Sequence, residues 1–195
     1  MIAKTPIAVL ISGRGSNLQC LIDACAQPDY PARIVAVISN RPDAYGLERA
    51  REAGITAIAI DHKAFETRED FEAALDAALR EAGAEFVCLA GFMRILGEDF
   101  VNRWLGRMVN IHPSLLPAYK GLHTHERALA DGVSEHGCTV HFVTPGLDEG
   151  PAILQARIPV FAGDTPETLA ERLLVEEHRI YPEALRLLAS GKATL

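Results

Sequence analysis

The sequence lacks any apolar run long enough to cross a lipid bilayer as a helix, which needs about 20 residues. Its first apolar segment, residues 7–11, is also too short for the core of a secretion signal. We therefore predict no membrane partner and expect a soluble protein of the cytoplasm.

An excess of positive charge is missing as well. The chain has 19 Lys and Arg residues against 26 Asp and Glu residues, and its formal net charge is −7 at pH 7. A protein of this charge needs a concentrated basic face to bind nucleic acid. The basic residues instead alternate with acidic ones, as in the segment Leu47–Gly54. We predict no nucleic-acid partner.

Metal-binding spacings are also missing. The four cysteines form no Cys-x-x-Cys pair, and no His-Glu-x-x-His motif occurs. His123 and His125 stand two residues apart at a predicted helix start, where their rings would diverge, and are interpreted as turn residues. His141 alternates with apolar neighbours and is interpreted as a buried supporting or core histidine. The prediction is a protein with reduced cysteines and no metal.

What is present is the composition of an ordinary globular domain. Apolar residues make up 49% and charged residues 23% of the chain. No linker, repeat or low-complexity stretch interrupts it, so we predict one domain over residues 1–195. Short β-branched runs alternate with segments of helical periodicity. Strands are predicted at residues 7–12, 33–39, 56–61, 86–91, 108–111, 138–144 and 152–160.

This alternation predicts an open α/β fold. The first strands are apolar on both faces, which is typical of a mostly parallel sheet with helices on both faces. A short loop joins the last two strands, which are expected to be antiparallel, so the sheet is mixed. Thr67 with Asp70 indicates a capping box, and Thr165 indicates the start of the last helix. Pro182 is expected to kink or split that helix.

A glycine-rich turn, residues 12–17 (SGRGSN), follows the first predicted strand. Backbone N–H groups at the start of the next helix, with the side chains of Ser16 and Asn17, favour a phosphate. A dinucleotide fingerprint would need glycine at position 18, where Leu18 stands. A single phosphate therefore fits better, although a tight turn that only needs glycine's backbone freedom is an equal alternative.

A polar group closes the fifth predicted strand. Asn110 and His112 lie two residues apart, so their side chains point to the same face, and Pro113 follows at once. Asp148 lies in the loop after the sixth strand. An amide, an imidazole and a carboxylate that meet can bind an oxyanion and move a proton. A hydrogen-bonded turn histidine is the alternative for His112.

Two adjacent glutamates in the last helix have different surroundings. Arg172 and Arg179 flank Glu176 at helical spacing, which predicts a solvated ion pair. Glu177 has apolar neighbours at the same spacings. A carboxylate in an apolar stripe is costly unless it meets a cation, either from the protein or from a ligand amine.

Taken in order, five segments resemble the phosphoribosylglycinamide formyltransferase family, which are folate-dependent enzymes of purine synthesis. The segments are VLISGRGSNLQ, LAGFMRIL, NIHPSLLPAYKGLHTH, HFVTPGLDEGPAILQ and EEHRIYP, and the resemblance runs from about Ile7 to Gly191. It implies an open Rossmann-like fold, no metal, and 10-formyltetrahydrofolate as co-substrate. Arg14 departs from the pattern, because relatives often have Asn or Thr there.

The resemblance also implies residue roles. Asn110, His112 and Asp148 would be catalytic: the amide and a protonated imidazole would stabilise the oxyanion, and the imidazole or a water would move the proton. The ribonucleotide substrate would bind at Gly15, Ser16, Asn17, Leu18 and Gln19, with Glu177 at its amine. Folate would bind at Arg68, Met93, Arg94, Ile95, Leu96, Asn110, Thr144, Pro145, Gly146, Leu147 and Asp148.

The expected reaction moves a formyl group from the folate to the amine of glycinamide ribonucleotide, and the partners are small molecules. Two alternatives stay open: another formyl-folate transferase or hydrolase, and a non-catalytic nucleotide-binding module. A monomer and a homodimer are both compatible with the sequence.

Overall fold

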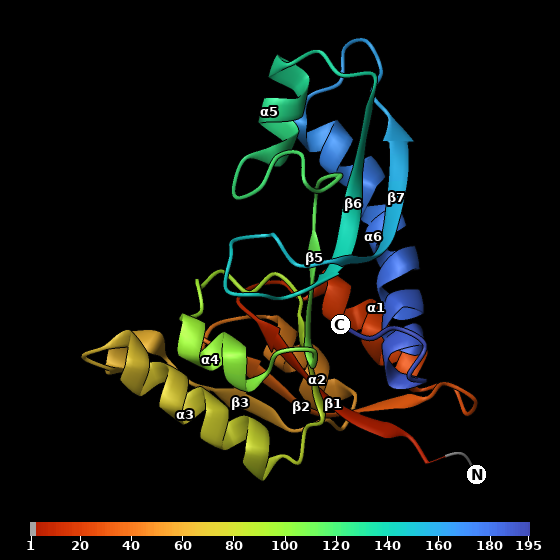
Figure 1. Cartoon of the computed structure of the whole chain (residues 1–195). Helices are drawn as coiled ribbons and strands as arrows, with labels where there is room; N and C mark the ends of the chain where they lie inside the picture. The colour runs from red at the N-terminus through yellow and green to blue at the C-terminus, as the bar shows by residue number, and fades with distance from the viewer. Residues whose placement is uncertain (1–2) are drawn as a thin grey trace.

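The computed structural model describes residues 3–195, which form one seven-stranded sheet with helices on both faces (Figure 1). The strand order is β3-β2-β1-β4-β5-β6-β7. The strands are β1 (Thr5–Ile11), β2 (Ala32–Ser39), β3 (Ala57–Ala59), β4 (Phe86–Leu89), β5 (Met108–His112), β6 (Glu135–Phe142) and β7 (Ala152–Pro159). The helices are α1 (Ser16–Cys25), α2 (Gly46–Glu52), α3 (Arg68–Glu81), α4 (Glu98–Arg103), α5 (Thr124–Ala130) and α6 (Pro166–Ala189), with a 3₁₀ turn at His62–Ala64.

The sheet is mixed, as predicted. Strands β1 to β5 pair in parallel, whereas β6 and β7 are antiparallel additions at one edge. The chain builds outward from β1 to β2 and β3, and then continues on the other side of β1 with β4. Such a reversal of strand order opens a ligand crevice at the carboxyl ends of the strands.

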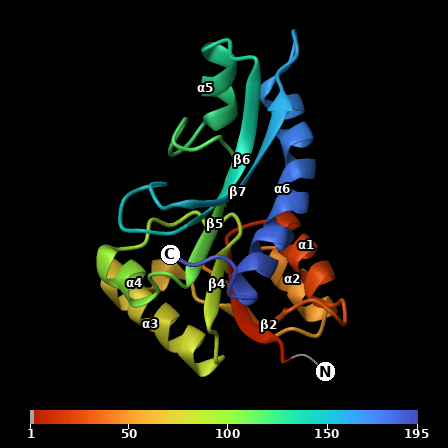
Figure 2. The ribbon, with the colours of Figure 1, turned by 45° about the vertical axis from the view of Figure 1, so that its right-hand side comes forward.

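Helices cover both faces of the sheet, which confirms the predicted fold class. The buried residues of α1, α2 and α6 belong to one hydrophobic cluster, and those of α3 and α4 belong to a second cluster on the opposite face. Figure 2 shows α6 along one side of β6 and β7, with α3 and α4 on the other side of the sheet. On β5, Val109 and Ile111 face the first cluster, so Asn110 and His112 face the side of α3 and α4.

Helix ends follow the predicted chemistry in part. The Thr67 side chain accepts the N–H of Asp70 and thereby caps α3. The carboxylate of Asp70 accepts from the Thr67 hydroxyl instead of the Thr67 backbone N–H, so the capping box is incomplete. The full reciprocal box occurs at α6, between Thr165 and Thr168. The expected split at Pro182 is wrong, because α6 runs as one helix with that proline inside it.

Helix α6 is tied to the sheet at two hydroxyl groups. Tyr30 donates to the carbonyl of Pro182 at 2.7 Å, and Tyr181 donates to the carbonyl of Leu89, at the end of β4, at 2.7 Å. The Tyr181 bond holds α6 at the carboxyl end of β4, and the Tyr30 bond holds it beside the start of β2. No helix in the described part of the chain is both long and apolar enough to cross a membrane.

Candidate active site

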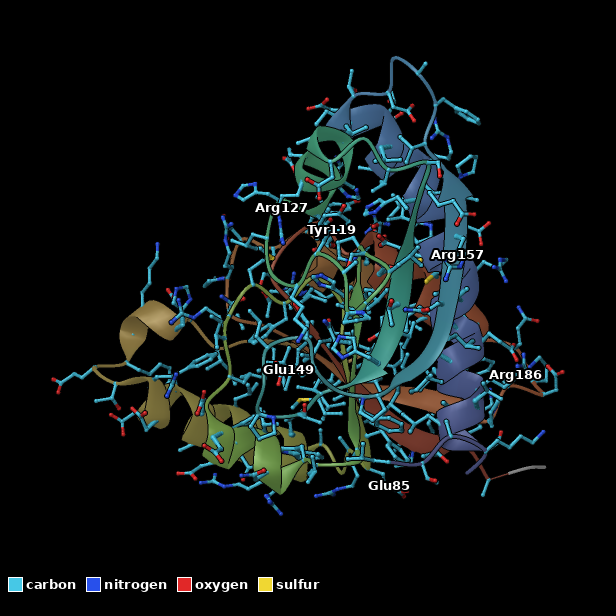
Figure 3. The ribbon with its side chains drawn as sticks, turned by 45° about the horizontal axis from the view of Figure 1, so that its top comes forward. Glu85, Tyr119, Arg127, Glu149, Arg157 and Arg186 are labelled. Carbon is cyan, nitrogen blue, oxygen red and sulfur yellow. The ribbon has the colours of Figure 1, made fainter. Side chains whose placement is uncertain are left out.

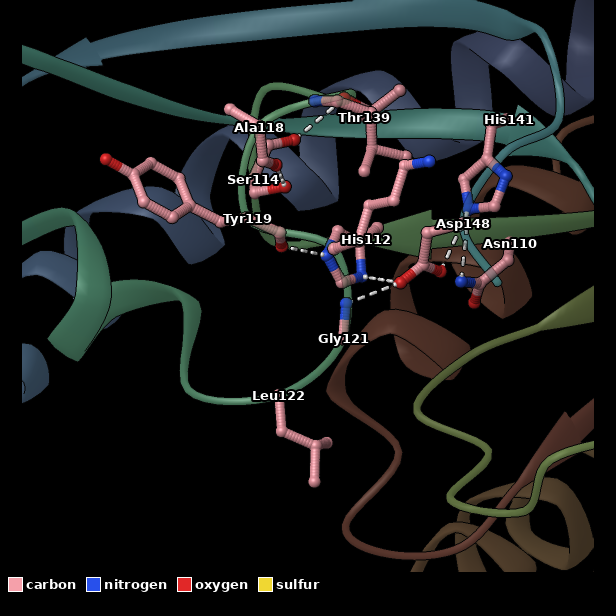
Figure 4. Close-up of polar contacts among 12 residues, drawn as sticks. Asn110, His112, Ser114, Ala118, Tyr119, Gly121, Leu122, Thr139, His141 and Asp148 are labelled. Atoms are coloured by element: carbon pink, nitrogen blue, oxygen red, sulfur yellow. Dashed lines mark hydrogen bonds and ion pairs between the residues drawn. The ribbon is translucent and has the colours of Figure 1, made fainter. Parts of the chain in front are cut away.

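The structure brings Asn110, His112 and Asp148 together, as Figure 4 shows. Asn110 and His112 come from β5, and Asp148 reaches them from the loop between β6 and β7. The Nδ1 of His112 lies 3.5 Å from Oδ2 of Asp148. His141, opposite Asn110 on β6, links the other two: its Nε2 lies 3.3 Å from Nδ2 of Asn110 and 3.9 Å from Oδ1 of Asp148.

His112 is buried and both of its ring nitrogens are engaged. Its Nε2 lies 2.9 Å from the carbonyl oxygen of Tyr119, and a carbonyl only accepts, so this nitrogen carries a proton. Its Nδ1 faces the carboxylate of Asp148. The ring is therefore held between a carbonyl oxygen and a carboxylate oxygen.

His141 holds the amide of Asn110 in a defined orientation. Its Nδ1 lies 2.9 Å from the carbonyl of Phe142, which places the proton on Nδ1 and leaves Nε2 to accept from Asn110. Burial lowers the pKa of His141, which keeps the ring neutral. One N–H of the Asn110 amide is thereby fixed, and its other donor is left for a ligand.

Two loops meet over the cluster of Asn110, His112 and Asp148. Asp148, with a left-handed φ of 51°, accepts the backbone N–H of Gly121 at 2.8 Å, and Lys120 pairs with Glu149 at 3.0 Å. Arg127 donates to the carbonyl of Lys120 at 2.7 Å and lies over the ring of Tyr119. Figure 3 shows Tyr119 and Arg127 side by side. The loop that supplies the carbonyl to His112 is thus anchored by the loop that supplies Asp148.

The glycine-rich turn lies at the carboxyl end of β1. Gly15 has φ 76° and precedes α1, a left-handed conformation that favours glycine. A Cβ at Gly15 would lie 2.9 Å from the Cα of Gly46, so α2 packs directly against the turn. The Oγ of Ser12 accepts the N–H of Met93 at 2.8 Å, which joins this turn to the loop after β4.

Glu177 faces α1 and contacts Asn17, whose Nδ2 donates to Oε2 of Glu177 at 2.8 Å. Burial raises the pKa of Glu177, and the hydrogen bond from Asn17 opposes that rise. The Oδ1 of Asn17 is buried without a hydrogen-bond partner within residues 3–195. A carboxylate and an unfilled carbonyl oxygen here can accept from an N–H-bearing ligand. Glu176, in contrast, pairs with Arg179 at 2.6 Å, as predicted, while Arg172 binds Asp164 instead.

The loop after β4 carries four of the predicted folate residues: Met93, Arg94, Ile95 and Leu96. Its far end is fixed by Glu72, a buried side chain whose Oε1 accepts the N–H of Gly97 at 2.6 Å. Arg68, the first residue of α3, reaches the same point, with its Nε 3.7 Å from Oε1 of Glu72. Arg68 therefore lies beside the loop.

Exposed apolar side chains lie in the loop after β4 and in the loop that carries Asp148. Met93 and Ile95 are 67% and 73% exposed, and Leu147, in the segment Thr144–Asp148, is 56% exposed. Large apolar side chains that face water in this way are available to a ligand with an apolar ring. Their roles in folate binding stay predictions.

Three further histidines, His123, His125 and His136, lie at or next to α5. His123 precedes α5 in a left-handed conformation, as expected of a turn residue. His125 is not a turn residue: it lies within α5, and its Nδ1 is 3.1 Å from Nε2 of His136. Burial lowers the pKa of His136 to about 4. Within residues 3–195, no group of three or more His, Cys, Asp or Glu side chains is placed to hold a metal ion.

Sequence reasoning missed the backbone groups of this site. The carbonyl of Tyr119 and the N–H of Gly121 bind His112 and Asp148, and a backbone group leaves no signature in residue type. It also missed Arg49, whose Nε donates to the carbonyl of Arg14 in the glycine-rich turn. The sequence shows a cationic residue in the short helix LERAREAG, but no local pattern indicates that this residue lies close to the glycine-rich turn.

A comparison with known families and proteins agrees with this arrangement. A family model described as formyl transferase matches residues 5–185. Phosphoribosylglycinamide formyltransferase of Escherichia coli (strain K12) is 51% identical over 186 residues, which is 95% of this chain and 88% of that protein. The human trifunctional purine biosynthetic protein adenosine-3 is 52% identical over 192 residues; this chain spans 19% of its length.

Solved structures of related proteins are also similar to this chain. The structure of the phosphoribosylglycinamide formyltransferase from Coxiella burnetii in complex with CHES superposes with a TM-score of 0.94 at 53% identity, covering 98% of this chain and 90% of that one. Glycinamide ribonucleotide transformylase 1 from Symbiobacterium toebii gives a TM-score of 0.94 at 54% identity, covering 96% and 89%.

Replacing Glu177 by Gln tests whether burial of its carboxylate lowers the stability of the folded protein. Because the pKa of Glu177 is raised in the folded protein, the folded state holds this proton more tightly than the unfolded chain. The protein is then less stable above the raised pKa than below the ordinary range of a carboxyl group. We expect Glu177→Gln to raise the melting temperature at pH 7–8 and to leave it nearly unchanged below about pH 4.

Glu176→Gln is the matched control for this stability test, because Glu176 is ion-paired and lies next in the chain. It should not stabilise the protein at either pH. Equal melting temperatures of Glu177→Gln and the parent at pH 8 would contradict a costly buried carboxylate.

Proposed function

Because the chain belongs to the formyl transferase family, we propose that it transfers the formyl group of 10-formyltetrahydrofolate to the amine of N1-(5-phospho-D-ribosyl)glycinamide. The products are formylglycinamide ribonucleotide and tetrahydrofolate, in the de novo synthesis of purines. The observation that carries this proposal is the convergence of Asn110, His112 and Asp148 from two segments of the chain. The relatives named for this reaction match the chain over nearly its whole length.

The reaction begins when the amine nitrogen attacks the formyl carbon. A carbon–nitrogen bond forms, and the carbonyl electron pair moves to the oxygen, which becomes negative. The free N–H of Asn110 and the protonated ring of His112 are placed to stabilise that oxygen. The intermediate then collapses and expels N10 of the folate.

Protons must move for the reaction to balance. The attacking amine loses one proton, and N10 of the folate gains one. His112, or a water held by Asp148, carries the proton between them. Because Nε2 of His112 donates to the carbonyl of Tyr119 in the structure, that contact must be exchanged before Nε2 can donate to substrate. The loop of Tyr119 therefore takes part in assembling the site.

The two substrates fit different parts of the site at the carboxyl ends of the parallel strands. The glycine-rich turn and residues Ser16 to Gln19 offer N–H and polar side-chain groups for the phosphoribosyl unit. Glu177 and the unfilled Oδ1 of Asn17 are acceptors for the glycinamide amine. Met93, Ile95 and Leu147 offer apolar contact for the pterin, and Arg68 with Arg94 supply charge for the folate carboxylates.

The remaining parts of the proposal concern partners and location. The ligands are small molecules, and we place the protein in the cytoplasm, where purine precursors are made; whether it is a monomer or a homodimer stays open. A hydrolase of formyl-folate is the competing enzyme function, because it uses the same oxyanion-binding group. The acceptor residues Asn17 and Glu177 favour the transferase.

Mixing the protein with both substrates tests the proposal directly. Formation of tetrahydrofolate, followed by its absorbance, should require the ribonucleotide. Tetrahydrofolate formed without the ribonucleotide would indicate a hydrolase, and no product with both substrates would indicate a non-catalytic module.

Substitutions in the catalytic group should lower turnover without unfolding the protein. We expect His112→Ala to lower kcat by about 10²–10⁴-fold and Asn110→Ala by about 10²–10³-fold. Asp148→Asn should act similarly to His112→Ala, because it removes the charge that faces His112. The measurement is steady-state kinetics on variants whose circular dichroism matches the parent.

Controls for these variants come from exposed residues of the same type. Asn102→Ala, on the surface of α4, and His123→Ala, with its ring largely in water, should keep parental turnover. A folded His112→Ala variant with near-parental kcat would overturn the mechanism.

Replacing Glu177 should weaken binding of the ribonucleotide more than binding of the folate. In Glu177→Ala, the KM for the ribonucleotide should rise by about tenfold or more, as expected for one lost charge-assisted contact. The KM for the folate should change little. Glu176→Ala, the adjacent control, should leave both KM values unchanged, and an unaltered ribonucleotide KM in Glu177→Ala would remove Glu177 from the proposed site.

His141 should affect turnover indirectly, by orienting the side-chain amide of Asn110. His141→Phe keeps a ring in the buried space and removes the acceptor that holds the Asn110 amide. We expect kcat to fall about tenfold, which corresponds to about 1.4 kcal/mol of lost transition-state stabilisation, while both KM values stay near the parent's. Adding His141→Phe to Asn110→Ala should cause little further loss. Fully multiplicative losses in the double variant would show that His141 acts independently of Asn110.

A further inference from the structure

Arg49 lies against the glycine-rich turn but belongs to another element, α2. Its Nε donates to the carbonyl of Arg14 at 2.8 Å, and its Nη1 donates to the side-chain oxygen of Gln19 at 3.2 Å. A Cβ at Gly15 would lie 3.4 Å from Cδ of Arg49, so the aliphatic stem packs close to the turn. The guanidinium also lies over the ring of Tyr45, 5.1 Å from its centroid. The Arg49 side chain is therefore held in place on several sides.

Helix α2 holds two consecutive carbonyls of the turn. The N–H of Gly46 donates to the carbonyl of Gly13 at 3.0 Å, and Arg49 donates to the next carbonyl, that of Arg14. Both peptide bonds are trans, since the one cis bond within residues 3–195 is Leu116–Pro117. In a trans peptide, the C=O and the N–H point in opposite directions. The N–H groups of Arg14 and Gly15 are therefore aimed away from α2.

These two N–H groups are available to a ligand. Neither donates to a backbone carbonyl in the described part of the chain. They precede α1, whose first turn adds further N–H groups at the positive end of the helix dipole. The orientation of the Arg14 carbonyl therefore decides whether the turn presents N–H groups or an oxygen to an anion.

We infer that Arg49 is a positioning residue for the phosphate of the ribonucleotide substrate, which it serves by holding the Arg14 carbonyl toward α2. The inference rests on the proposed function, because that function supplies the phosphate. Without this hydrogen bond, the Arg14–Gly15 peptide can rotate and turn its carbonyl oxygen toward the phosphate. An oxygen in that position repels the anion and withdraws the N–H of Gly15 from it.

The positive charge of Arg49 is the competing explanation, since a cation near the turn attracts phosphate through space. Two substitutions separate the hydrogen bond from the charge. Arg49→Gln places an amide N–H at the position of Nε and removes the charge. Arg49→Met has a similar length and lacks both the donor and the charge. Arg51→Met is the matched control, because Arg51 lies on the same helix and pairs with Glu48 at 3.1 Å.

The experiment measures KM and kcat for the ribonucleotide in the parent and the three variants. In Arg49→Met, the KM for the ribonucleotide should rise about tenfold, which corresponds to about 1.4 kcal/mol and is typical of a hydrogen bond from a charged donor. The kcat and the KM for the folate should stay within about twofold of the parent's. Arg49→Gln should recover most of the affinity, and Arg51→Met should match the parent.

A substrate without the phosphate, the glycinamide riboside, provides a readout that a general structural defect would not give. Its kcat/KM should be the same in all four proteins, because it has no phosphate for the turn to bind. Equal losses in Arg49→Gln and Arg49→Met would assign the effect to charge and overturn the inference, and so would an equal loss on the riboside or an unaltered KM in Arg49→Met. A parent protein that forms no tetrahydrofolate contradicts the proposed function itself, whereas an active parent with an unaffected Arg49→Met contradicts only the role of Arg49.

Discussion

The carboxylate of Asp148 joins three parts of the molecule that are far apart in the sequence. One oxygen accepts the N–H of Gly121 and faces the ring of His112, and the other oxygen faces His141. Asp148 holds a left-handed backbone conformation, which is unfavourable for a side-chain-bearing residue. The hydrogen bond from Gly121 and the contact with His112 offset that cost, and through them the β6–β7 loop fixes the loop that covers β5. The site is therefore assembled by tertiary contacts, and its geometry depends on both loops being in place.

Glu177, the predicted binding residue, and Asn110 and His112, the predicted catalytic residues, lie on opposite faces of the sheet. Asn110 and His112 face the side of α3 and α4, whereas Glu177 lies on α6, which covers the other face. The hydroxyl of Tyr181, one helical turn after Glu177, binds the carbonyl of Leu89, and Leu89 pairs with Asn110 across β4 and β5. The two sides therefore meet at the ends of β4 and β5.

Much of the fold was predictable because its strands and helices are locally consistent. The apolar runs at residues 7–12 and 33–39 have no polar face, and buried parallel strands are their simplest explanation. The 3₁₀ turn at His62–Ala64 was missed as an element, and only the start of α5 was predicted, because short segments carry too little periodicity. Of the expected kink or split at Pro182, the split does not occur, because the packing of Tyr181 and its neighbours in the core outweighs the local preference of a proline to end a helix.

The cluster of Asn110, His112 and Asp148 was predictable only in residue type and strand position. Two polar residues at the end of an apolar strand indicated which face they share, but the pairing of Asn110 with His141 depends on the antiparallel register of β5 and β6, which no local pattern specifies. The same holds for Arg49, whose contact with the turn follows from the close packing of Gly15 on Gly46. Local rules are broken where ligands are expected: within residues 3–195, the half-buried Glu177 pairs with no cation and the carbonyl oxygen of Asn17 has no partner. Such conflicts are expected at functional sites, where the rest of the fold compensates for their cost, so they point to this part of the molecule as a binding site.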